Sequence, residues 1–496
     1  MLATQRALLR QATHRLAMHP FYRCSTTTTT TRHKRYETST TLAELVNEVD
    51  ELGPGYCSLS KIICTVGPST HSPSLIQNLV DEGMQIMRIN CAKSTIEETK
   101  ERVSWLRECH GLQGGSGSSS KFQDTPHPPN RPRNLRSVMF DTKSEEHLKL
   151  ALELDVDFVS FNASDVDTVR STLSDLQQSS HTALPKLIAK IQSADALTNF
   201  DDILQVADGI LIERGLLAVD IPLGVVRAQK QIVQKCNVAG KPVIIASQML
   251  DSMLDHPTPT RAEVSDIVNA VYDGADCVML SRESSEGSFP IESCQTLAKI
   301  AWKADKAQAQ HSVPVRRRRS TPPPTTTTTT AGEQGSRSEN KEQDYFNRGV
   351  WPAMTRAAVQ QAQSGDVDLI VVITSSGKTA EMCSAEKGPV PIMAFVADPK
   401  VGRQLSMFRG VQPVYGPIKH MPPVSKKFET NVSLRISKEK KDMVQHEFLM
   451  VRPKEAVIRA KELNMVQTGD TVLIVMSEPS SNVLGRTLTT RTARVK

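Results

Sequence analysis

The chain has 496 residues, of which 39% are hydrophobic and 4% aromatic, and this length allows a large core in two domains plus unstructured segments. No apolar run reaches the about 18 residues that a transmembrane helix needs, so we expect no membrane association. The nine cysteines show no CxxC spacing, and Cys64 and Cys277 stand within apolar runs, as small hydrophobic residues in a reduced compartment do.

The positive charge is concentrated at the N-terminus. The net charge of the chain is +6, but residues 1–36 hold seven Lys and Arg residues and no Asp or Glu, so the remainder is nearly neutral. The same segment is rich in Ser and Thr, as mitochondrial transit peptides are. We expect residues 1–40 to be a transit peptide of a mitochondrial protein, with a disordered tail of a cytoplasmic protein as the alternative. The near-neutral remainder argues against direct binding of nucleic acid.

From Lys61 the chain repeats an apolar strand, a polar strand end and an amphipathic helix. Eight such units predict a (β/α)8 TIM barrel over residues 57–305. The expected strands are Lys61–Gly67, Gln85–Cys91, Arg136–Thr142, Asp157–Ala163, Lys186–Gln192, Gly209–Gly215, Pro242–Gln248 and Cys277–Glu283. In such a barrel the functional side chains lie where the strands end.

Two segments interrupt this pattern. Residues 111–132 are rich in Gly, Ser and Pro and predict a disordered insertion, and residues 306–345 predict a disordered linker. Within the linker, Arg316–Arg319 precedes a Pro/Thr run, which indicates either a solvated spacer or a docking site for a partner.

A smaller α/β domain is predicted over residues 346–496. Its expected apolar strands are Asp368–Thr374, Pro391–Val396 and Thr471–Ser477. Together with the barrel, this gives an α/β fold with two domains.

Hydroxyl-bearing residues, a glycine and a lysine follow the first strand of this smaller domain. At a helix N-terminus such residues suit an anion, because free backbone N–H groups and the helix dipole favour negative charge. The loop therefore predicts a site for a phosphorylated effector, with ordinary helix capping as the alternative. Its residues are Thr374, Ser375, Ser376, Gly377, Lys378 and Thr379.

The stretch from Lys186 to Leu217 carries a dense set of polar residues at strand ends. A buried Lys190 beside the strand-end residues Arg214 and Gly215 could hold a phosphoryl group or a carboxylate. No carboxylate stands in the usual place for a divalent metal, and this absence weighs against metal-dependent chemistry.

Several blocks of sequence resemble the pyruvate kinase family. They are KIICTVGP at Lys61–Pro68, GMQIMRIN at Gly83–Asn90, AGKPVIIASQMLDSM at Ala239–Met253, PTRAE at Pro259–Glu263 and NAVYDGADCVMLS at Asn269–Ser281. With the C-terminal domain, the resemblance covers most of residues 60–305 and 350–496. It implies phosphoryl transfer from phosphoenolpyruvate to ADP, with magnesium and potassium as cofactors.

The resemblance also implies roles for individual residues that agree with the family. Lys190 would assist phosphoryl transfer. The substrate would be contacted by Arg88, Gly215 and Ser247, and potassium would be bound by Asn90, Asp141 and Thr142.

Several departures from the family pattern stand at the same site. Gln192 replaces the glutamate and Leu216 the aspartate that hold the divalent metal, and Ala92 replaces a serine near the potassium ion. Glu213 belongs to a different strand position, so we do not expect it to take their place. The family's lid domain is also missing, because Lys143 is followed directly by the next helix. These losses argue against magnesium and potassium binding and against turnover.

The sequence therefore favours a catalytically impaired or inactive pyruvate kinase homologue with a binding or assembly role, in a homo-oligomer or a hetero-complex. Two alternatives stay open. One is an active pyruvate kinase of glycolysis, and the other is a subunit of a mitochondrial assembly that contains RNA.

Overall fold

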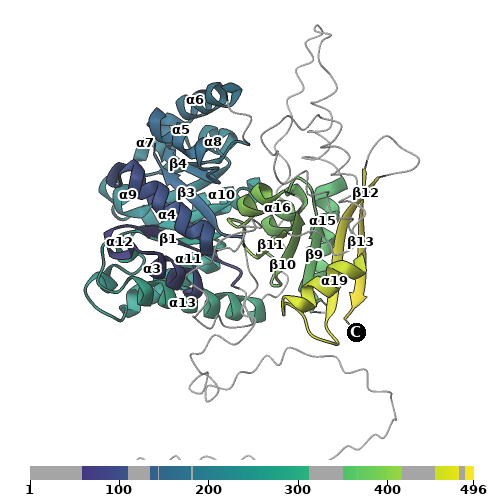
Figure 1. The fold of residues 1–496 in the computed structure, drawn as a ribbon. Coiled ribbons are helices and arrows are strands. Elements are labelled where there is room, and N and C mark those ends of the chain that lie inside the picture. Colours follow the sequence, from purple (N-terminus) through teal and green to yellow (C-terminus); the bar gives the residue numbers. More distant parts are fainter. Residues whose placement is uncertain are drawn as a thin grey trace, which may run out of the picture. The chain divides into compact units, whose positions relative to one another are not determined.

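The computed structural model describes a barrel and a C-terminal α/β domain (Figure 1). The described residues are 58–109, 135–142, 144–179, 183–311, 350–365, 367–396, 398–415, 453–479 and 486–495. The expected transit peptide, the insertion at 111–132 and most of the linker lie outside them. None of the described helices is long and apolar enough to cross a membrane.

Eight parallel strands form a closed barrel in chain order, which confirms the predicted TIM barrel. Each strand pairs with the next, and β8 pairs with β1 to complete the ring. The strands are β1 Lys61–Val66, β2 Ile86–Asn90, β3 Ser137–Asp141, β4 Phe158–Asn162, β5 Lys186–Ile191, β6 Gly209–Glu213, β7 Val243–Ala246 and β8 Cys277–Leu280.

Two of the barrel helices begin with side-chain caps. Ser72 accepts a hydrogen bond from the backbone N–H of Leu75 at the start of α3, and Thr260 and Glu263 form a capping box at the start of α11. The helices are α3 Pro73–Glu82, α4 Ile96–Cys109, α5 Glu145–Glu153, α6 Val166–Ser179, α7 Ala194–Thr198, α8 Phe200–Val206, α9 Arg214–Asp220, α10 Val225–Ala239, α11 Arg261–Asp273, α12 Arg282–Ser285 and α13 Pro290–His311. Because α13 continues to His311, the expected linker boundary at residue 306 falls inside a helix.

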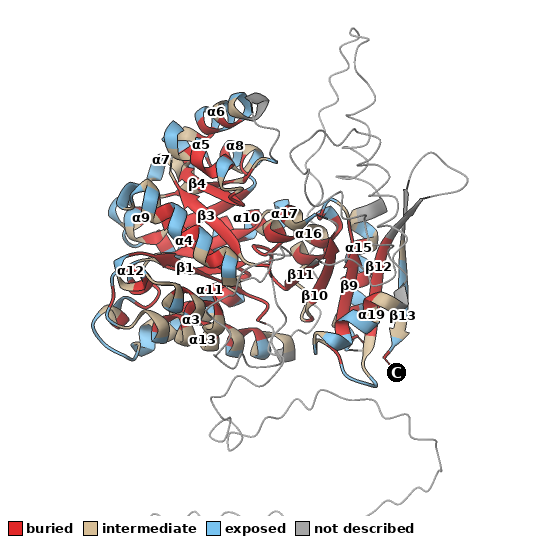
Figure 2. Cartoon of the chain, in the orientation of Figure 1, coloured by how far each residue is buried: buried red, intermediate tan, exposed pale blue. Residues whose placement is uncertain are grey.

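Two clusters of apolar side chains hold the barrel together. The barrel strands are buried along most of their length (Figure 2). Side chains that alternate along each strand point either into the barrel or outward against the helices. The inner set includes Ile63, Ile86, Met139 and Ile188, all buried. This alternation decides which strand-end residues face the mouth of the barrel.

The junction between β3 and α5 is short. Three residues, from Thr142 to Ser144, separate the end of β3 from the first residue of α5. A connection of this length leaves no room for an inserted domain at this position.

The C-terminal domain contains a five-stranded sheet in the order β11-β10-β9-β12-β13, parallel except for β13. The strands are β9 Leu369–Ile373, β10 Ile392–Val396, β11 Val411–Tyr415, β12 Thr471–Pro479 and β13 Arg486–Arg494. The predicted strands correspond to β9, β10 and β12. The two strands at the edges of the sheet, β11 and β13, were not predicted, because a proline interrupts one and the other is polar.

Helices cover both faces of this sheet (Figure 1). One apolar cluster joins the sheet to α15 Val350–Gln363, α16 Lys378–Ala385 and α17 Pro399–Leu405, and another joins it to α19 Pro453–Glu462. The predicted smaller α/β domain is therefore confirmed.

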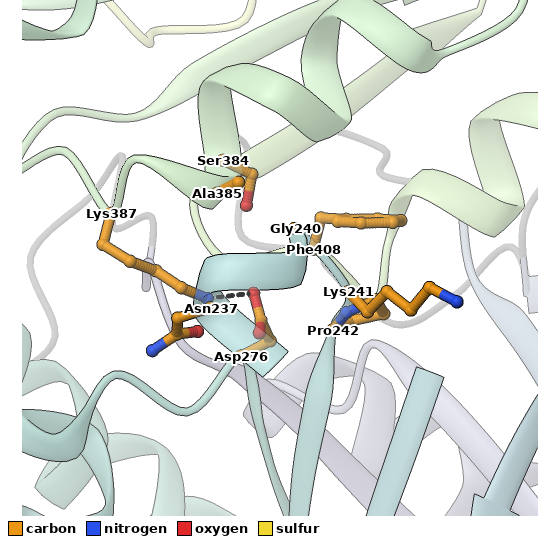
Figure 3. Close-up of a pocket in the computed structure, with 9 residues that line it drawn as sticks. All are labelled: Asn237, Gly240, Lys241, Pro242, Asp276, Ser384, Ala385, Lys387 and Phe408. Atoms are coloured by element: carbon orange, nitrogen blue, oxygen red, sulfur yellow. Dashed lines mark hydrogen bonds and ion pairs between the residues drawn. The ribbon is translucent and has the colours of Figure 1, made fainter. Parts of the chain in front are cut away.

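A shallow crevice lies where the C-terminal domain meets the amino ends of β7 and β8 (Figure 3). Lys387 donates to Asp276 at 2.6 Å beside it, and both side chains are largely buried. Burial lowers the pKa of Lys387, while the charge of Asp276 opposes this shift. The crevice lies at the opposite end of the strands from the residues expected to do chemistry.

Candidate active site

Three charged side chains converge at the carboxyl end of the barrel. Arg88 lies on β2, Asp141 ends β3 and Lys190 lies on β5. Lys190 Nζ donates to Asp141 Oδ1 at 2.8 Å, and the Arg88 guanidinium donates to Oδ2 of the same carboxylate. The residue two positions earlier on each strand packs inside the barrel, so alternation points all three side chains inward. The cluster carries one net positive charge.

The two cations control the ionisation of Asp141. Burial disfavours its charged form, but the charges of Arg88 and then Lys190 outweigh burial and hold the pKa of the carboxyl below its ordinary value. Asp141 is therefore ionised at neutral pH. An anion that enters the barrel mouth competes with Asp141 for both cations.

Arg88 is fixed from another side by Thr65 of β1, a residue that the sequence analysis missed. Arg88 donates to Thr65 Oγ1 at 3.0 Å, and this hydroxyl donates to the Leu280 carbonyl at 2.9 Å. Arg88 Nε is buried and has no hydrogen-bond partner among the described residues. The signal in the sequence was a threonine at an inward position of an otherwise apolar strand.

The residues expected to bind potassium have their oxygens engaged within the chain. Asn90 Oδ1 accepts the Ala92 N–H at 3.2 Å, and Thr142 Oγ1 lies 3.3 Å from His147 Nδ1. Asp141 already faces two cations, which repel a third. Each of these oxygens therefore already has a partner within the chain, and the charges of Arg88 and Lys190 disfavour a potassium ion beside Asp141.

The positions expected to bind a divalent metal offer poor ligands. Gln192 follows β5 and supplies only a neutral amide oxygen, and Leu216 on α9 is 50% exposed and supplies none. Magnesium in proteins is held through one or two carboxylates, together with water and substrate phosphates. The nearby Asp141 carboxylate is neutralised by Arg88 and Lys190. Gln192 and Leu216 therefore supply no carboxylate for the magnesium ion that the family implies.

Glu213 lies closer to this site than the sequence analysis assumed. Ile191 on β5 pairs with Ile212 on β6. The next residues along the chain, Gln192 and Glu213, therefore lie at the same height along the barrel. Glu213 itself pairs with Ala246, which belongs to the inner layer of the barrel, so its carboxylate points toward the mouth. The strand position differs from that of Gln192, but the two strands are adjacent in the barrel.

Arg214 does not face the mouth, contrary to the expectation that it would bind an anion with Lys190. Its buried guanidinium donates to the Ser247 carbonyl at 2.8 Å and to the Gln248 carbonyl at 2.9 Å, and it pairs with Asp266. Gly215 follows it, and a Cβ built there would lie 3.6 Å from Ser247 Cβ. Gly215 and Ser247, two of the residues expected to contact the substrate, are therefore neighbours.

Glu283 is a further buried carboxyl near the mouth that the sequence analysis did not single out. Its two oxygens accept the N–H groups of Leu250 and Ser281, at 3.1 and 2.8 Å. Burial raises the pKa of Glu283, and the charge of Asp251 adds to this shift against the effect of the backbone donors. A carboxyl engaged in this way orders two loops and is not a free metal ligand.

The predicted anion loop lies at the N-terminus of α16. Thr374 Oγ1 accepts the Gly377 N–H at 3.0 Å, and Gly377 has φ +82°, which glycine adopts without strain. Ser376 and Lys378 are exposed, Ser375 is half-buried, and Thr374, Gly377 and Thr379 are buried. The loop has the expected position, and its lysine side chain is accessible.

Glu381 connects this loop to the barrel. Its carboxylate accepts from Lys378 at 3.3 Å and from Lys186, the first residue of β5. Burial opposes its ionisation, but Lys186 and then Lys378 hold the pKa of Glu381 below its ordinary value.

Two family models match this chain. The model described as "Pyruvate kinase, barrel domain" matches residues 58–137 and 133–294, and the one described as "Pyruvate kinase, alpha/beta domain" matches residues 352–495. The chain belongs to the pyruvate kinase family. The barrel match divides near β3, next to the short β3–α5 junction.

Curated relatives agree with this assignment. The chain is 32% identical to "Pyruvate kinase" of Lactobacillus delbrueckii subsp. bulgaricus, over 81% of this chain and 58% of the relative. It is 33% identical to "Pyruvate kinase" of Clostridium perfringens, over 75% of this chain and 67% of the relative. It is 40% identical to "Pyruvate kinase" of Eimeria tenella, over 46% of this chain and 38% of the relative. The match thus spans well under two thirds of the length of some pyruvate kinase relatives.

Proposed function

We propose that this chain binds phosphoenolpyruvate at the carboxyl ends of the barrel strands and transfers its phosphoryl group to ADP poorly or not at all. The observation that supports binding is the convergence of Arg88 and Lys190 on Asp141, which places two cations at the mouth with one net positive charge. Phosphate and carboxylate groups are recognised by such cations through charge-assisted hydrogen bonds. The proposal for poor transfer rests on Gln192 and Leu216, which supply no carboxylate.

Isothermal calorimetry with phosphoenolpyruvate, in the absence of divalent metal, tests the binding. We expect saturable binding with a dissociation constant of about 1 mM or below, and a loss of about tenfold or more for Lys190→Met, because one charge-assisted hydrogen bond is removed. Lys235→Met is the matched control, since Lys235 is a lysine of α10 that pairs with the exposed Asp201. Equal affinity in both variants would contradict binding at the barrel mouth.

The second candidate function is an active pyruvate kinase. It is favoured by the names of the relatives and by the inward placement of Glu213 beside Gln192, because a single carboxylate with substrate phosphates is enough for some magnesium sites. Magnesium and potassium would then be the cofactors that the family implies. The turnover measurement described in the Discussion separates the two candidates.

A phosphorylated effector at the loop from Thr374 to Thr379 is part of the same proposal. The loop offers the N-terminus of α16 and the exposed Lys378, both favourable to an anion. In the calorimetric titration with phosphoenolpyruvate, binding at the loop would appear as a second binding event. We expect Lys378→Gln to remove this event and Lys190→Met to leave it in place. A homo-oligomer or a hetero-complex with another protein, including an assembly that contains RNA, is compatible with this function.

We further propose a mitochondrial location, on the basis of the basic, acid-free segment 1–36. A full-length fusion with a C-terminal fluorescent protein is expected in mitochondria with the N-terminal segment removed. A cytoplasmic fusion with an intact N-terminus would contradict the transit peptide.

A further inference from the structure

The turn that follows β7 has an unusual backbone. Ser247 has φ +67° and Gln248 has φ +55°, so two consecutive residues other than glycine adopt the left-handed region. Such residues are uncommon, and they persist only where the surrounding structure holds them. Because Ser247 stands at the carboxyl end of a barrel strand, its hydroxyl is placed by this turn.

Arg214 holds the turn through its carbonyl groups. Its Nε and one terminal nitrogen donate to the Ser247 carbonyl at 3.1 and 2.8 Å, and the same terminal nitrogen donates to the Gln248 carbonyl at 2.9 Å. The other terminal nitrogen pairs with Asp266 and lies 3.5 Å from Gln229 Oε1. The planar guanidinium is thereby fixed on both sides, which a flexible ammonium could not reproduce.

Glu283 holds the other end of the same turn. It accepts the Leu250 N–H, three residues after Ser247, and the Ser281 N–H at the end of β8. The Glu283 side chain is almost completely buried, so it contributes by ordering the backbone. Arg214, which follows β6, therefore fixes the carbonyl groups at the start of the turn. Glu283, which follows β8, fixes the amide at its end.

The Ser247 side chain lies beside Gly215, and its hydroxyl has no hydrogen-bond partner within the part of the chain that the structure describes. We propose that Arg214 and Glu283 are positioning residues, which hold the left-handed turn so that the Ser247 hydroxyl donates to an oxygen of the bound ligand. The inference rests on the proposed binding of phosphoenolpyruvate at the barrel mouth. Neither Arg214 nor Glu283 contacts the ligand in this arrangement.

A double-mutant cycle tests whether Arg214 acts through Ser247. We expect Arg214→Gln and Ser247→Ala each to weaken phosphoenolpyruvate binding by about tenfold. The double variant should also lose about tenfold, because both changes remove the same hydrogen bond, the one from the Ser247 hydroxyl to the ligand. A loss of about a hundredfold in the double variant would show independent effects and overturn the proposal. Arg409→Gln is the matched control, since Arg409 is a buried arginine paired with Asp305 away from the turn. An equal loss in Arg409→Gln would assign the effect to general destabilisation.

Hydrogen exchange of the turn provides a test that needs no ligand. We expect Arg214→Gln to accelerate exchange of the Met249 and Leu250 amides by at least about tenfold relative to Arg409→Gln, because the carbonyls that fix the turn lose their donors. Glu283→Gln should accelerate exchange of the Leu250 amide in the same way. Unchanged exchange in both variants would overturn the positioning role. If the wild-type protein did not bind phosphoenolpyruvate but Arg214→Gln still accelerated exchange, the proposed function would be overturned. The role of Arg214 in ordering the turn would then still stand.

Discussion

Purified protein should turn over phosphoenolpyruvate and ADP at less than about 0.01 per second with magnesium present, measured by a coupled assay for pyruvate. A typical enzyme reaches about 10 per second, and the loss of one electrostatic group at an active site costs roughly 100- to 1,000-fold. Gln192 and Leu216 carry no negative charge, where the resemblance implies metal-binding carboxylates. The three-residue junction between β3 and α5 also leaves no room at that position for the family's lid, which would exclude water.

Restoring the carboxylates tests the cause of this low rate. Gln192→Glu with Leu216→Asp should bind manganese in electron paramagnetic resonance titrations, while turnover rises less because the lid is still absent. The control is Gln205→Glu with Leu223→Asp, which adds the same charges at exposed positions near the same strands. Equal manganese binding in the control would contradict a metal site at the restored positions.

A wild-type rate within about tenfold of 10 per second would refute the impaired enzyme and favour the active one. In that case Glu213→Gln should abolish both turnover and manganese binding, since Glu213 is the inward carboxylate next to Gln192. Retention of both properties by Glu213→Gln would exclude it as the replacement ligand.

The barrel could be predicted because its signals are local and repeated. A fully buried strand such as β1 forms a mostly apolar run. The polar residues at the carboxyl ends of such strands form the candidate site. Lys190, Arg88 and Asp141 were identified from the resemblance, but their mutual contacts depend on strand register, which brings residues 53 and 49 positions apart within hydrogen-bonding distance.

The error in placing Arg214 has the same origin. Arg214 follows a strand directly, so from sequence it was grouped with Lys190, yet its side chain turns toward β7. Glu213 was assigned to a different strand from Gln192, as the structure has it, and only the register shows that the two strands are adjacent. Sequence position gives the strand to which a residue belongs, and only the closed sheet shows which side chains meet.

Loss of a buried ion pair between the two domains should cause the largest change in stability. Arg403 on α17 donates to Asp157 Oδ1 at 2.6 Å, and Asp157, just before β4, is fully buried. Asp157 Oδ2 also accepts the Val138 N–H at 2.9 Å. Arg403 also pairs with the partly exposed Asp155, which this change leaves in place. Asp157→Ala should therefore lower the free energy of unfolding by about 3 kcal/mol, because the buried guanidinium loses one of its two carboxylate partners and the Val138 amide loses its acceptor.

Urea titration followed by circular dichroism measures this change. The control is Asp201→Ala, which removes the exposed pair with Lys235 at 2.5 Å and should cost less than about 1 kcal/mol. The double variant Asp157→Leu with Arg403→Met should be more stable than Asp157→Ala, because apolar groups of similar volume need no compensating charge. If the double variant were the less stable of the two, the cost would come from lost packing at the domain contact and not from the loss of a carboxylate partner of Arg403.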